Sequence, residues 1–270
     1  DFLFKKNKIE AVYGEAKIID SNKISITLND EGNKEIETKN IVIATGSIPS
    51  SIPGVEISGD KIISSTEALS LNEVSNKLVV VGGGYIGLEL GSVWSRLGSE
   101  VTVIEYLNRI TPGMDNEVSS ALQKILSKQG LNFSLNSQVI SVSEEGSNAS
   151  VVMKNRESNE EETIEADYVL ISTGRKPYLE NLFNDGIDVQ KTDAGFIKTD
   201  SHLRTNIDGI WAIGDVVEGP MLAHKAEEEG IAVAELIAGK PGHVNYDIIP
   251  SVIYTNPEVA SVGMTEEQLK

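Results

Sequence analysis

The sequence predicts an α/β fold in which one arrangement of strands occurs twice, and three observations predict it. First, an apolar run, a glycine-rich turn and a helical pattern follow one another between Lys77 and Gly98. Second, apolar runs that end in Thr-Gly occur at both Ile41–Gly46 and Val169–Gly174. Third, each of these runs follows several short β-type segments separated by turn residues. Apolar strands next to helices indicate a mainly parallel sheet, and the short segments indicate a β-meander in each half.

Composition narrows the class of protein. At 270 residues the chain is long enough for about two domains. Its formal net charge of −18 argues against nucleic acid or an anionic membrane as a partner, and no apolar run reaches the roughly 18 residues of a transmembrane helix. The lack of cysteine excludes a disulfide scaffold and a thiolate metal site. We therefore expect no metal and a cytoplasmic protein. We interpret the acidic clusters as a solvated surface: Glu144–Glu145, Glu160–Glu162 and Glu227–Glu229.

The glycine-rich turn is the best-defined ligand motif in the chain. Gly82, Gly84 and Gly87 stand at GxGxxG spacing directly after the predicted strand Leu78–Val81. Gly82 permits a tight turn, Gly84 lets the backbone approach a pyrophosphate, and Gly87 lets the following helix pack close to the strand. The N-terminus of that helix offers N–H groups to the phosphates. This context predicts a dinucleotide site, with a turn that binds nothing as the alternative.

An acidic residue sets the kind of dinucleotide that we expect. Glu105 ends a second predicted strand, Val101–Ile104, about 20 residues after Gly84. A carboxylate at this position accepts hydrogen bonds from a ribose 2′-OH and repels a 2′-phosphate. The sequence therefore predicts NAD(H) rather than NADP(H).

The remaining elements can be assigned in order along the chain. Strands are expected in the first meander at Ile9–Tyr13, Ala16–Asp20, Lys23–Leu28 and Glu35–Thr38, and in the second at Gln138–Ser143, Ser150–Lys154 and Thr163–Glu165. The helix after the glycine turn carries apolar residues at helical spacing, namely Ile86, Leu90, Val93 and Leu97. A second helix is expected over Asn116–Gln129, with Gly130 at its C′ position.

The last third of the chain contains a buried strand, a helix and a new segment. Ile210–Gly214 predicts a short buried strand that ends at Asp215. A helix over Met221–Gly239 follows, and we expect it to pack through its apolar residues Leu222, Ala223, Ala226, Ala234, Leu236 and Ile237. Residues 244–270 begin a further segment, with a strand at Ser251–Tyr254 and a capping box that starts at Thr265.

These motifs and their order resemble the pyridine nucleotide–disulfide oxidoreductases, flavoproteins with two dinucleotide-binding domains and a C-terminal interface domain. The matching motifs are Ala44-Thr45-Gly46, Gly82-x-Gly84-x-x-Gly87, Thr173-Gly174-Arg175 and Ala212-Ile213-Gly214-Asp215. The resemblance implies an α/β fold with two Rossmann-like dinucleotide-binding domains, each with a β-meander insertion, plus the start of an α+β interface domain. It assigns 1–70 and 196–243 to an FAD-binding domain, 71–195 to an NAD-binding domain and 244–270 to a dimerisation domain.

The resemblance also implies two cofactors, FAD and NAD. The FAD set would be Ala16 at the adenine, Thr45, Gly46 and Ser47 beside the phosphate and ribose, Asp215 at the hydroxyls, and Met221, Leu222, Ala223 and His224 against the isoalloxazine. The NAD set would be Gly82, Gly84, Ile86 and Gly87 at the pyrophosphate, Glu105 at the adenosine ribose, Val139 and Gly174 along the cleft, and Glu89 between the cofactors. Structural alternatives remain open: a helix cap for Asp215 or His224, a surface position for Glu89, and core for Met221.

The resemblance places the chemistry outside these residues. Members of the family react through a cysteine pair in the first domain and a His–Glu pair in the C-terminal domain. Because the chain has no cysteine, we expect it to be a fragment that contains no catalytic residue and is inactive by itself. The sequence of Gly219–Gly230 most resembles that of family members that oxidise dihydrolipoamide through the disulfide and pass the electrons through FAD to NAD⁺. Such an enzyme would act on lipoyl domains, as a homodimer within 2-oxo acid dehydrogenase complexes.

Two other functions stay open on the sequence alone. One is a sibling in the same family, either an NAD(P)H-dependent disulfide reductase or a soluble transhydrogenase. Glu105 argues against the NADP-dependent siblings, which generally carry basic residues at this position. The other is a non-catalytic NAD-binding module that has kept the fold, because fold does not fix function.

Overall fold

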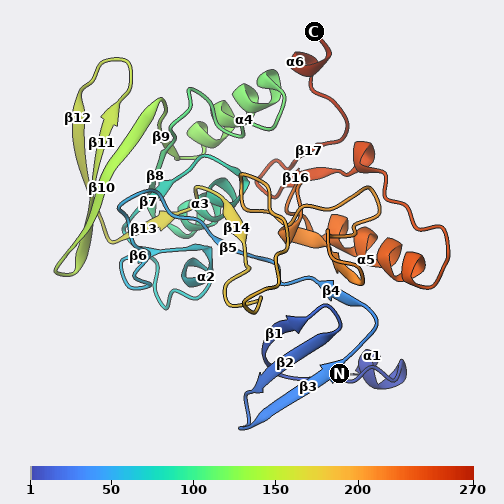
Figure 1. Ribbon diagram of the computed structural model, residues 1–270. Coiled ribbons are helices and arrows are strands. Elements are labelled where there is room, and N and C mark those ends of the chain that lie inside the picture. The colour runs from blue at the N-terminus through green and yellow to red at the C-terminus, as the bar shows by residue number, and fades with distance from the viewer. Residues whose placement is uncertain (1) are drawn as a thin grey trace. The chain divides into compact units, whose positions relative to one another are not determined.

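The computed structural model describes residues 2–270 (Figure 1). These residues form two compact units. Unit 1 contains the residues up to Ile48 together with Lys176–Asn245. Unit 2 contains Pro49–Arg175 together with Tyr246–Lys270. The predicted mixed α/β fold with a parallel sheet is confirmed.

Unit 2 is built on a five-stranded parallel sheet in the order β6–β13–β7–β8–β9. Its strands are β6 (Ile62–Ile63), β7 (Lys77–Val81), β8 (Glu100–Ile104), β9 (Asn132–Ser134) and β13 (Tyr168–Ile171). The chain adds β8 and β9 on one side of β7 and then returns to the other side of β7 with β13. The direction of winding therefore reverses between β7 and β13. Open α/β sheets bind ligands at the carboxyl ends of strands at such a switch point.

Both faces of this sheet are covered, which explains the unbroken apolar sequence of β7. Leu78 and Val80 pack with helices α3 (Tyr85–Leu97) and α4 (Asn116–Lys128) on one face. Val79 and Val81 pack on the other face, against a three-stranded antiparallel meander. The meander strands, drawn in yellow-green in Figure 1, are β10 (Ser137–Glu145), β11 (Asn148–Asn155) and β12 (Glu161–Ala166). Unit 2 therefore has three layers: helices, sheet and meander.

Unit 1 repeats part of this plan. Its meander consists of β1 (Gly14–Asp20), β2 (Lys23–Leu28) and β3 (Asn33–Glu37), all antiparallel. The strand expected at Ile9–Tyr13 is wrong, because these residues form no strand in the structure and follow a short helix, α1 (Phe2–Lys6). The predicted apolar strands pair in parallel as β4 (Ile41–Ile43) and β15 (Ile210–Ala212). Ile41, Ile43 and Ile210 are buried in one cluster that forms the core of this unit.

The remaining elements connect or extend these layers. They are β5 (Ser47–Pro49), α2 (Ser65–Ala68), β14 (Arg175–Pro177), η1 (Gly214–Val216), α5 (Ala223–Ile237), η2 (Tyr246–Ile248), β16 (Ser251–Ile253), β17 (Val259–Ser261) and α6 (Glu266–Leu269). The predicted boundary at residue 70 lies inside unit 2, because β6 joins the sheet of that unit through β13. The segment from Tyr246 also lies in unit 2. Over residues 2–270, no helix is both long and apolar enough to span a bilayer.

Helix α5 is buried through a different face from the one that we expected. Its buried residues are Lys225, Glu229, Ala232 and Val233, whereas Ala223, Ala234 and Ile237 of the predicted set are exposed. The interpretation of Glu227–Glu229 as a solvated cluster is therefore wrong for Glu229, whose side chain is 0% exposed. The reason is an ion pair with Lys225, described below, which allows two charged side chains to occupy the interior.

The last segment of the chain is joined to α4 by two helix N-termini that face each other. Asp115 caps α4 by accepting a hydrogen bond from the Glu117 N–H at 2.9 Å, and it also accepts one from the Glu266 N–H at 3.1 Å. In return, the Glu267 carboxylate accepts a hydrogen bond from the Asn116 N–H at 3.2 Å. The capping box predicted at Thr265 is confirmed at the start of α6.

This contact predicts a pH dependence. The backbone N–H of Glu266, and then that of Glu117, hold the pKa of Asp115 below its usual value. Because the pKa of Asp115 is lowered in the folded state, its carboxylate stabilises the fold fully at pH values above the unfolded pKa of about 3.9. This stabilisation is lost as pH falls through the lowered pKa. We expect the Glu266 amide resonance to titrate with Asp115 below about pH 4. In Asp115→Asn this titration should be absent; an unchanged titration in the variant contradicts the assignment.

Candidate dinucleotide sites

The glycine turn after β7 is shaped by two close approaches of backbone. Gly82 has φ +112°, and a Cβ on it would lie 2.5 Å from the Ser172 carbonyl oxygen at the end of β13. A Cβ on Gly87 would lie 2.2 Å from the Gly82 carbonyl oxygen and 2.6 Å from the Ser172 Oγ. Both contacts are shorter than real Cβ atoms tolerate. The tight turn expected at Gly82 and the close packing expected at Gly87 are confirmed.

Gly84 has different surroundings. Its backbone is extended, with φ −79° and ψ −179°, so any residue can adopt this conformation. A Cβ on Gly84 would meet no atom of the described residues within 4 Å. Gly84 is the N-cap of α3, and together with Tyr85 and Ile86 it lines a cavity of about 230 Å³. The first turn of α3 therefore faces open space, where a helix N-terminus favours an anion.

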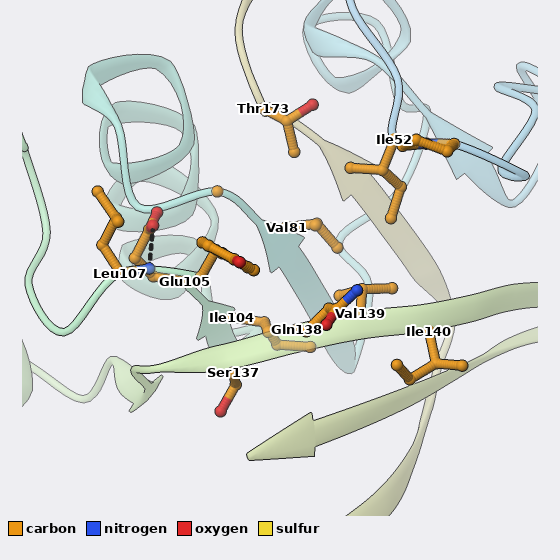
Figure 2. Close-up of a pocket in the computed structure, with 13 residues that line it drawn as sticks. Ile52, Val81, Ile104, Glu105, Leu107, Ser137, Gln138, Val139, Ile140 and Thr173 are labelled. Atoms are coloured by element: carbon orange, nitrogen blue, oxygen red, sulfur yellow. Dashed lines mark hydrogen bonds between the residues drawn. The ribbon is translucent and has the colours of Figure 1, made fainter. Parts of the chain in front are cut away.

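A larger cavity of about 650 Å³ lies at the same edge of the sheet (Figure 2). Gly82, Glu105 and Thr173 line both cavities, so the two adjoin at the carboxyl ends of β7, β8 and β13. The larger cavity is mostly apolar in its lining: Ile52, Pro53, Val81, Ile104, Leu107, Val139 and Ile140 contribute to it. Its volume falls within the range of about 300–1,000 Å³ that is usual for small-molecule sites.

Glu105 is the charged residue of this site, and it is held rigidly. Its side chain is 8% exposed. One carboxylate oxygen, Oε2, accepts a hydrogen bond from the Gly83 N–H at 2.6 Å, and Oε1 accepts one from the Leu107 N–H at 2.8 Å. A carboxylate has about four acceptor positions. Glu105 therefore keeps acceptor capacity for a hydroxyl group that enters the cavity, while a phosphate beside it would meet a buried negative charge.

The structure brings most of the predicted NAD residues together and places one apart. Val139 on β10 lines the larger cavity, and Gly174, with φ +126°, lines the smaller one. Glu89 lies on α3 and is not among the described residues that line either cavity. Its Oε1 accepts a hydrogen bond from the Tyr254 N–H at 2.8 Å. In this structure Glu89 thus contacts the segment that follows Tyr246.

The predicted FAD residues fall into three groups in unit 1. Ala16 on β1 and Thr45 after β4 line a common cavity of about 350 Å³, together with Tyr178. Thr45 Oγ1 donates a hydrogen bond to the Tyr178 carbonyl oxygen at 2.6 Å. Gly46 has φ +74°, and its carbonyl oxygen accepts a hydrogen bond from the Tyr178 N–H at 2.9 Å. The second group joins two strand ends, because Ser47 Oγ donates to Asp215 Oδ2 at 2.5 Å.

The third group marks the start of α5. Leu222 is the N-cap of this helix, and Met221 precedes it; both are partly buried. Ala223 and His224 form the first turn of α5 and are exposed. The N-cap leucine has no polar side chain to offer to the N–H groups of this turn. The start of α5 is therefore another helix N-terminus whose positive dipole end is not capped by its own N-cap side chain.

An ion pair that the sequence analysis missed lies beneath this turn. Lys225 and Glu229 are both 0% exposed, with Lys225 Nζ 3.0 Å from Glu229 Oε1. Glu229 Oε2 accepts a hydrogen bond from the Gly214 N–H at 2.6 Å, and Lys225 Nζ donates to the Gly214 carbonyl oxygen at 3.1 Å. The pair therefore fixes both polar groups of the residue that precedes Asp215. The spacing of four residues between Lys225 and Glu229 was visible in the sequence, but such spacing is also common on exposed helix faces.

Several lining residues were also missed in unit 2. Ser172 Oγ donates to the Val81 carbonyl oxygen at 3.0 Å and tightens the junction of β7 and β13. Thr173 lines both cavities, and Tyr106 and Gln138 line the larger one. Thr173 belongs to the repeated Thr-Gly motif, which was the signal available for it. Tyr106 lies directly after Glu105 in the sequence, which was the signal available for it, whereas Gln138 reaches the cavity only through long-range folding.

Comparison with known proteins agrees with this arrangement. Residues 1–230 match the family described as pyridine nucleotide-disulphide oxidoreductase. Dihydrolipoyl dehydrogenase 1, mitochondrial, of Arabidopsis thaliana is 51% identical over 268 residues, which cover 99% of this chain and 53% of that protein. Dihydrolipoyl dehydrogenase 3 of Pseudomonas putida is 48% identical over 270 residues, which cover 100% of this chain and 58% of that protein. The chain spans about half the length of these relatives.

A solved structure gives the same picture of the fold. The chain is similar to the HOCl-induced flavoprotein disulfide reductase RclA from Escherichia coli, with a TM-score of 0.86 and 29% sequence identity. The match covers 99% of this chain and 62% of that one.

Proposed function

Because the chain belongs to the pyridine nucleotide-disulphide oxidoreductases, we propose that it is part of a dihydrolipoyl dehydrogenase. Such an enzyme is a flavoprotein oxidoreductase that converts dihydrolipoamide and NAD⁺ to lipoamide and NADH. The observation that carries the proposal is the cavity at the β7–β13 switch point, with the buried Glu105 carboxylate on its lining. The names of the relatives described above support the choice of substrate.

The NAD half of the proposal rests on the fit of the described residues to a dinucleotide. Gly84 presents backbone to open space, so a pyrophosphate can approach it and the N–H groups of α3. Glu105 retains acceptors for the adenosine ribose. We propose that Ile86 and Gly87 support the pyrophosphate, that Val139 and Gly174 line the cleft, and that Glu89 faces the nicotinamide end. We propose NAD-binding for residues 71–195 and a dimerisation role for residues 244–270.

The FAD half rests on the unit 1 residues that lie at strand ends. We propose that Ala16 and Thr45 contact the adenosine part of FAD, because they line one cavity. Asp215, oriented by Ser47, would accept hydrogen bonds from FAD hydroxyls. The start of α5 would favour negative charge on the flavin ring through its dipole. When bound, FAD supplies the redox chemistry that links a dithiol to nicotinamide. The protein residues described here bind and orient the two cofactors.

Partners and compartment are parts of the same proposal. We propose that the full-length protein acts on lipoyl domains as a homodimer, within 2-oxo acid dehydrogenase complexes, and that it is cytoplasmic. The Arabidopsis relative carries the word mitochondrial in its name, so cell fractionation is the test of the compartment.

An activity assay tests the proposed function. The full-length protein that contains these residues should form NADH from dihydrolipoamide and NAD⁺. Residues 1–270 alone should form none, because the chain contains no cysteine. Turnover by residues 1–270 contradicts the account of the chemistry. Activity of the full-length protein with NADPH and another disulfide, but not with dihydrolipoamide, instead assigns it to a sibling reductase.

Glu105 provides a prediction about cofactor choice. Glu105→Arg should lower affinity for NADH and raise affinity for NADPH, because a positive charge replaces the carboxylate that repels a 2′-phosphate. We expect the ratio of the two dissociation constants to change by at least about tenfold, which corresponds to about 1.4 kcal/mol. Glu105→Gln is the control, since it keeps the size and removes only the charge. An unchanged ratio in Glu105→Arg removes the proposed role.

A further inference from the structure

An arginine stacked on a tyrosine stands at the edge of the larger cavity of unit 2. The guanidinium carbon of Arg156 lies 3.9 Å from the centre of the Tyr106 ring. Arg156 Nη1 also donates to the Tyr106 carbonyl oxygen and to Asn136 Oδ1, both at 3.2 Å. The Arg156 backbone N–H donates to the Asn136 carbonyl oxygen at 2.8 Å. Arg156 therefore holds both the ring and the backbone of Tyr106.

The loop that carries Tyr106 is fixed from two sides. On the cavity side, the Leu107 N–H donates to Glu105 Oε1 at 2.8 Å. On the other side, the Asn136 N–H donates to the Leu107 carbonyl oxygen at 2.7 Å, and the Ser137 N–H donates to the Glu105 carbonyl oxygen at 2.9 Å. Tyr106 follows directly after the residue that we assign to the ribose. Its position is thus set by the same hydrogen bonds that set Glu105.

The chemistry of the cavity indicates which part of a dinucleotide lies beside Tyr106. Thirteen of the described residues line the cavity, and among these Glu105 is the one that carries a charge. Leu107, Val139 and Ile140 line the same cavity as Tyr106 and give it apolar walls. A flat, uncharged aromatic base suits such a wall, and bases stack readily on aromatic side chains. Tyr106 is 50% exposed, so its ring has surface left for a ligand.

We propose that Tyr106 is the surface on which the adenine of the dinucleotide stacks, and that Arg156 is a positioning residue that holds this ring in place. The inference rests on the proposed NAD site and adds to it two residues at the adenosine end. A cation above the face of an aromatic ring is attracted to it, so the Arg156 guanidinium favours one orientation of the Tyr106 ring. The arginine acts through the tyrosine, because it is not among the described residues that line the cavity.

Titration calorimetry of residues 1–270 with ADP-ribose tests the inference, because ADP-ribose contains the adenosine end and lacks nicotinamide. Tyr106→Ala should weaken ADP-ribose binding about tenfold, and Tyr106→Phe should keep affinity within about twofold, since the ring remains. Arg156→Ala should weaken binding about threefold. In the double variant the loss should equal that of Tyr106→Ala, because Arg156 acts only through the ring.

Two controls separate this role from general stability. Lys61 lies 4.5 Å above the Tyr168 ring elsewhere in unit 2, so Lys61→Ala removes a similar contact outside the cavity and should leave ADP-ribose affinity unchanged. Reduced nicotinamide mononucleotide, which lacks adenosine, should bind Tyr106→Ala and the wild type equally. If Tyr106→Ala or Arg156→Ala binds ADP-ribose with wild-type affinity, the inference is wrong and the proposed NAD site still stands. Failure of the wild type to bind either ADP-ribose or NADH overturns the proposed NAD site together with it.

Discussion

Lys225→Ala should lower the free energy of unfolding of unit 1 by about 3–5 kcal/mol, because it leaves Glu229 as an uncompensated buried charge. Both side chains are 0% exposed, and Lys225 bonds both Glu229 and the Gly214 carbonyl oxygen. Urea unfolding in a Trp94→Phe background, in which Trp211 of unit 1 is the remaining fluorescence probe, measures the change. A loss below about 1 kcal/mol contradicts the assignment, since that is the size of an exposed ion pair.

The matched control removes both charges at once. Replacing a buried ion pair with apolar residues of similar volume is often neutral or stabilising. We therefore expect the double variant with Lys225→Met and Glu229→Leu to lose much less stability than Lys225→Ala, because its remaining cost is the unpaired N–H and carbonyl of Gly214. The Gly214 N–H then lacks the Glu229 acceptor, so we expect the orientation of Asp215 and the retention of FAD by the full-length protein to suffer. Loss of FAD in the double variant, which keeps most of the stability that Lys225→Ala loses, is the signature of a positioning role.

The second large effect concerns Gly87. Gly87→Ala places a Cβ 2.2 Å from the Gly82 carbonyl oxygen, and backbone cannot yield as a flexible side chain does. We expect a loss of about 3 kcal/mol in unfolding free energy, the upper end of the usual range for overpacking. NADH affinity should fall together with stability, because the glycine turn must shift. Wild-type stability in this variant contradicts the packing account.

Substitutions at two neighbouring glycines distinguish an effect on packing from an effect on NADH binding. Gly91→Ala lies one turn further along α3, where its Cβ would be 3.4 Å from Val101 Cγ1, an ordinary contact. It should be neutral or slightly stabilising, since alanine favours helix. Gly84→Ala meets no described atom within 4 Å, so it should cost less than about 1 kcal/mol of stability. Its added methyl group should nevertheless weaken NADH binding, because it stands where the pyrophosphate approaches.

The strands and turns of unit 2 were predictable because their sequence signals are local, even where the contacts behind them are not. Strand β7 reads as a continuous apolar run because both faces of the sheet are covered. Gly82 and Gly87 are required by contacts with the adjacent strand ends, and the GxGxxG spacing encodes both. The capping box at Thr265 is likewise a matter of four consecutive residues. These features can be recognised in the sequence without knowledge of the distant parts of the chain.

The buried faces of the helices were less predictable. Helix α3 buries Leu88 and Trp94, whereas Val93 and Leu97, which belong to the predicted apolar stripe, are 39% and 57% exposed. Helix α5 buries Lys225 and Glu229 together with Ala232 and Val233. Apolar periodicity identifies a helix, but it does not show which of the apolar residues are buried. It also predicts that every charged residue is exposed. A buried ion pair breaks that assumption, because each charge is stable inside only through the other.

The candidate site likewise contains some residues that could be predicted from the sequence and others that could not. Glu105 and the glycine turn are close in sequence, and their spacing predicted the arrangement. Tyr106 and Arg156 are 50 residues apart and meet because the meander returns to the end of β8. No local pattern signals such a meeting. Residues of this kind are identified only once the sheet order and the strand registers are known.

A crystal structure of residues 1–270 with bound NADH would show where the dinucleotide lies. We expect the pyrophosphate beside Gly84 at the N-terminus of α3, with a hydroxyl of the adenosine ribose within about 3 Å of a Glu105 oxygen. We also expect the adenine beside Tyr106. NADH bound away from the β7–β13 switch point, or a ribose that makes no contact with Glu105, would contradict the proposed NAD site.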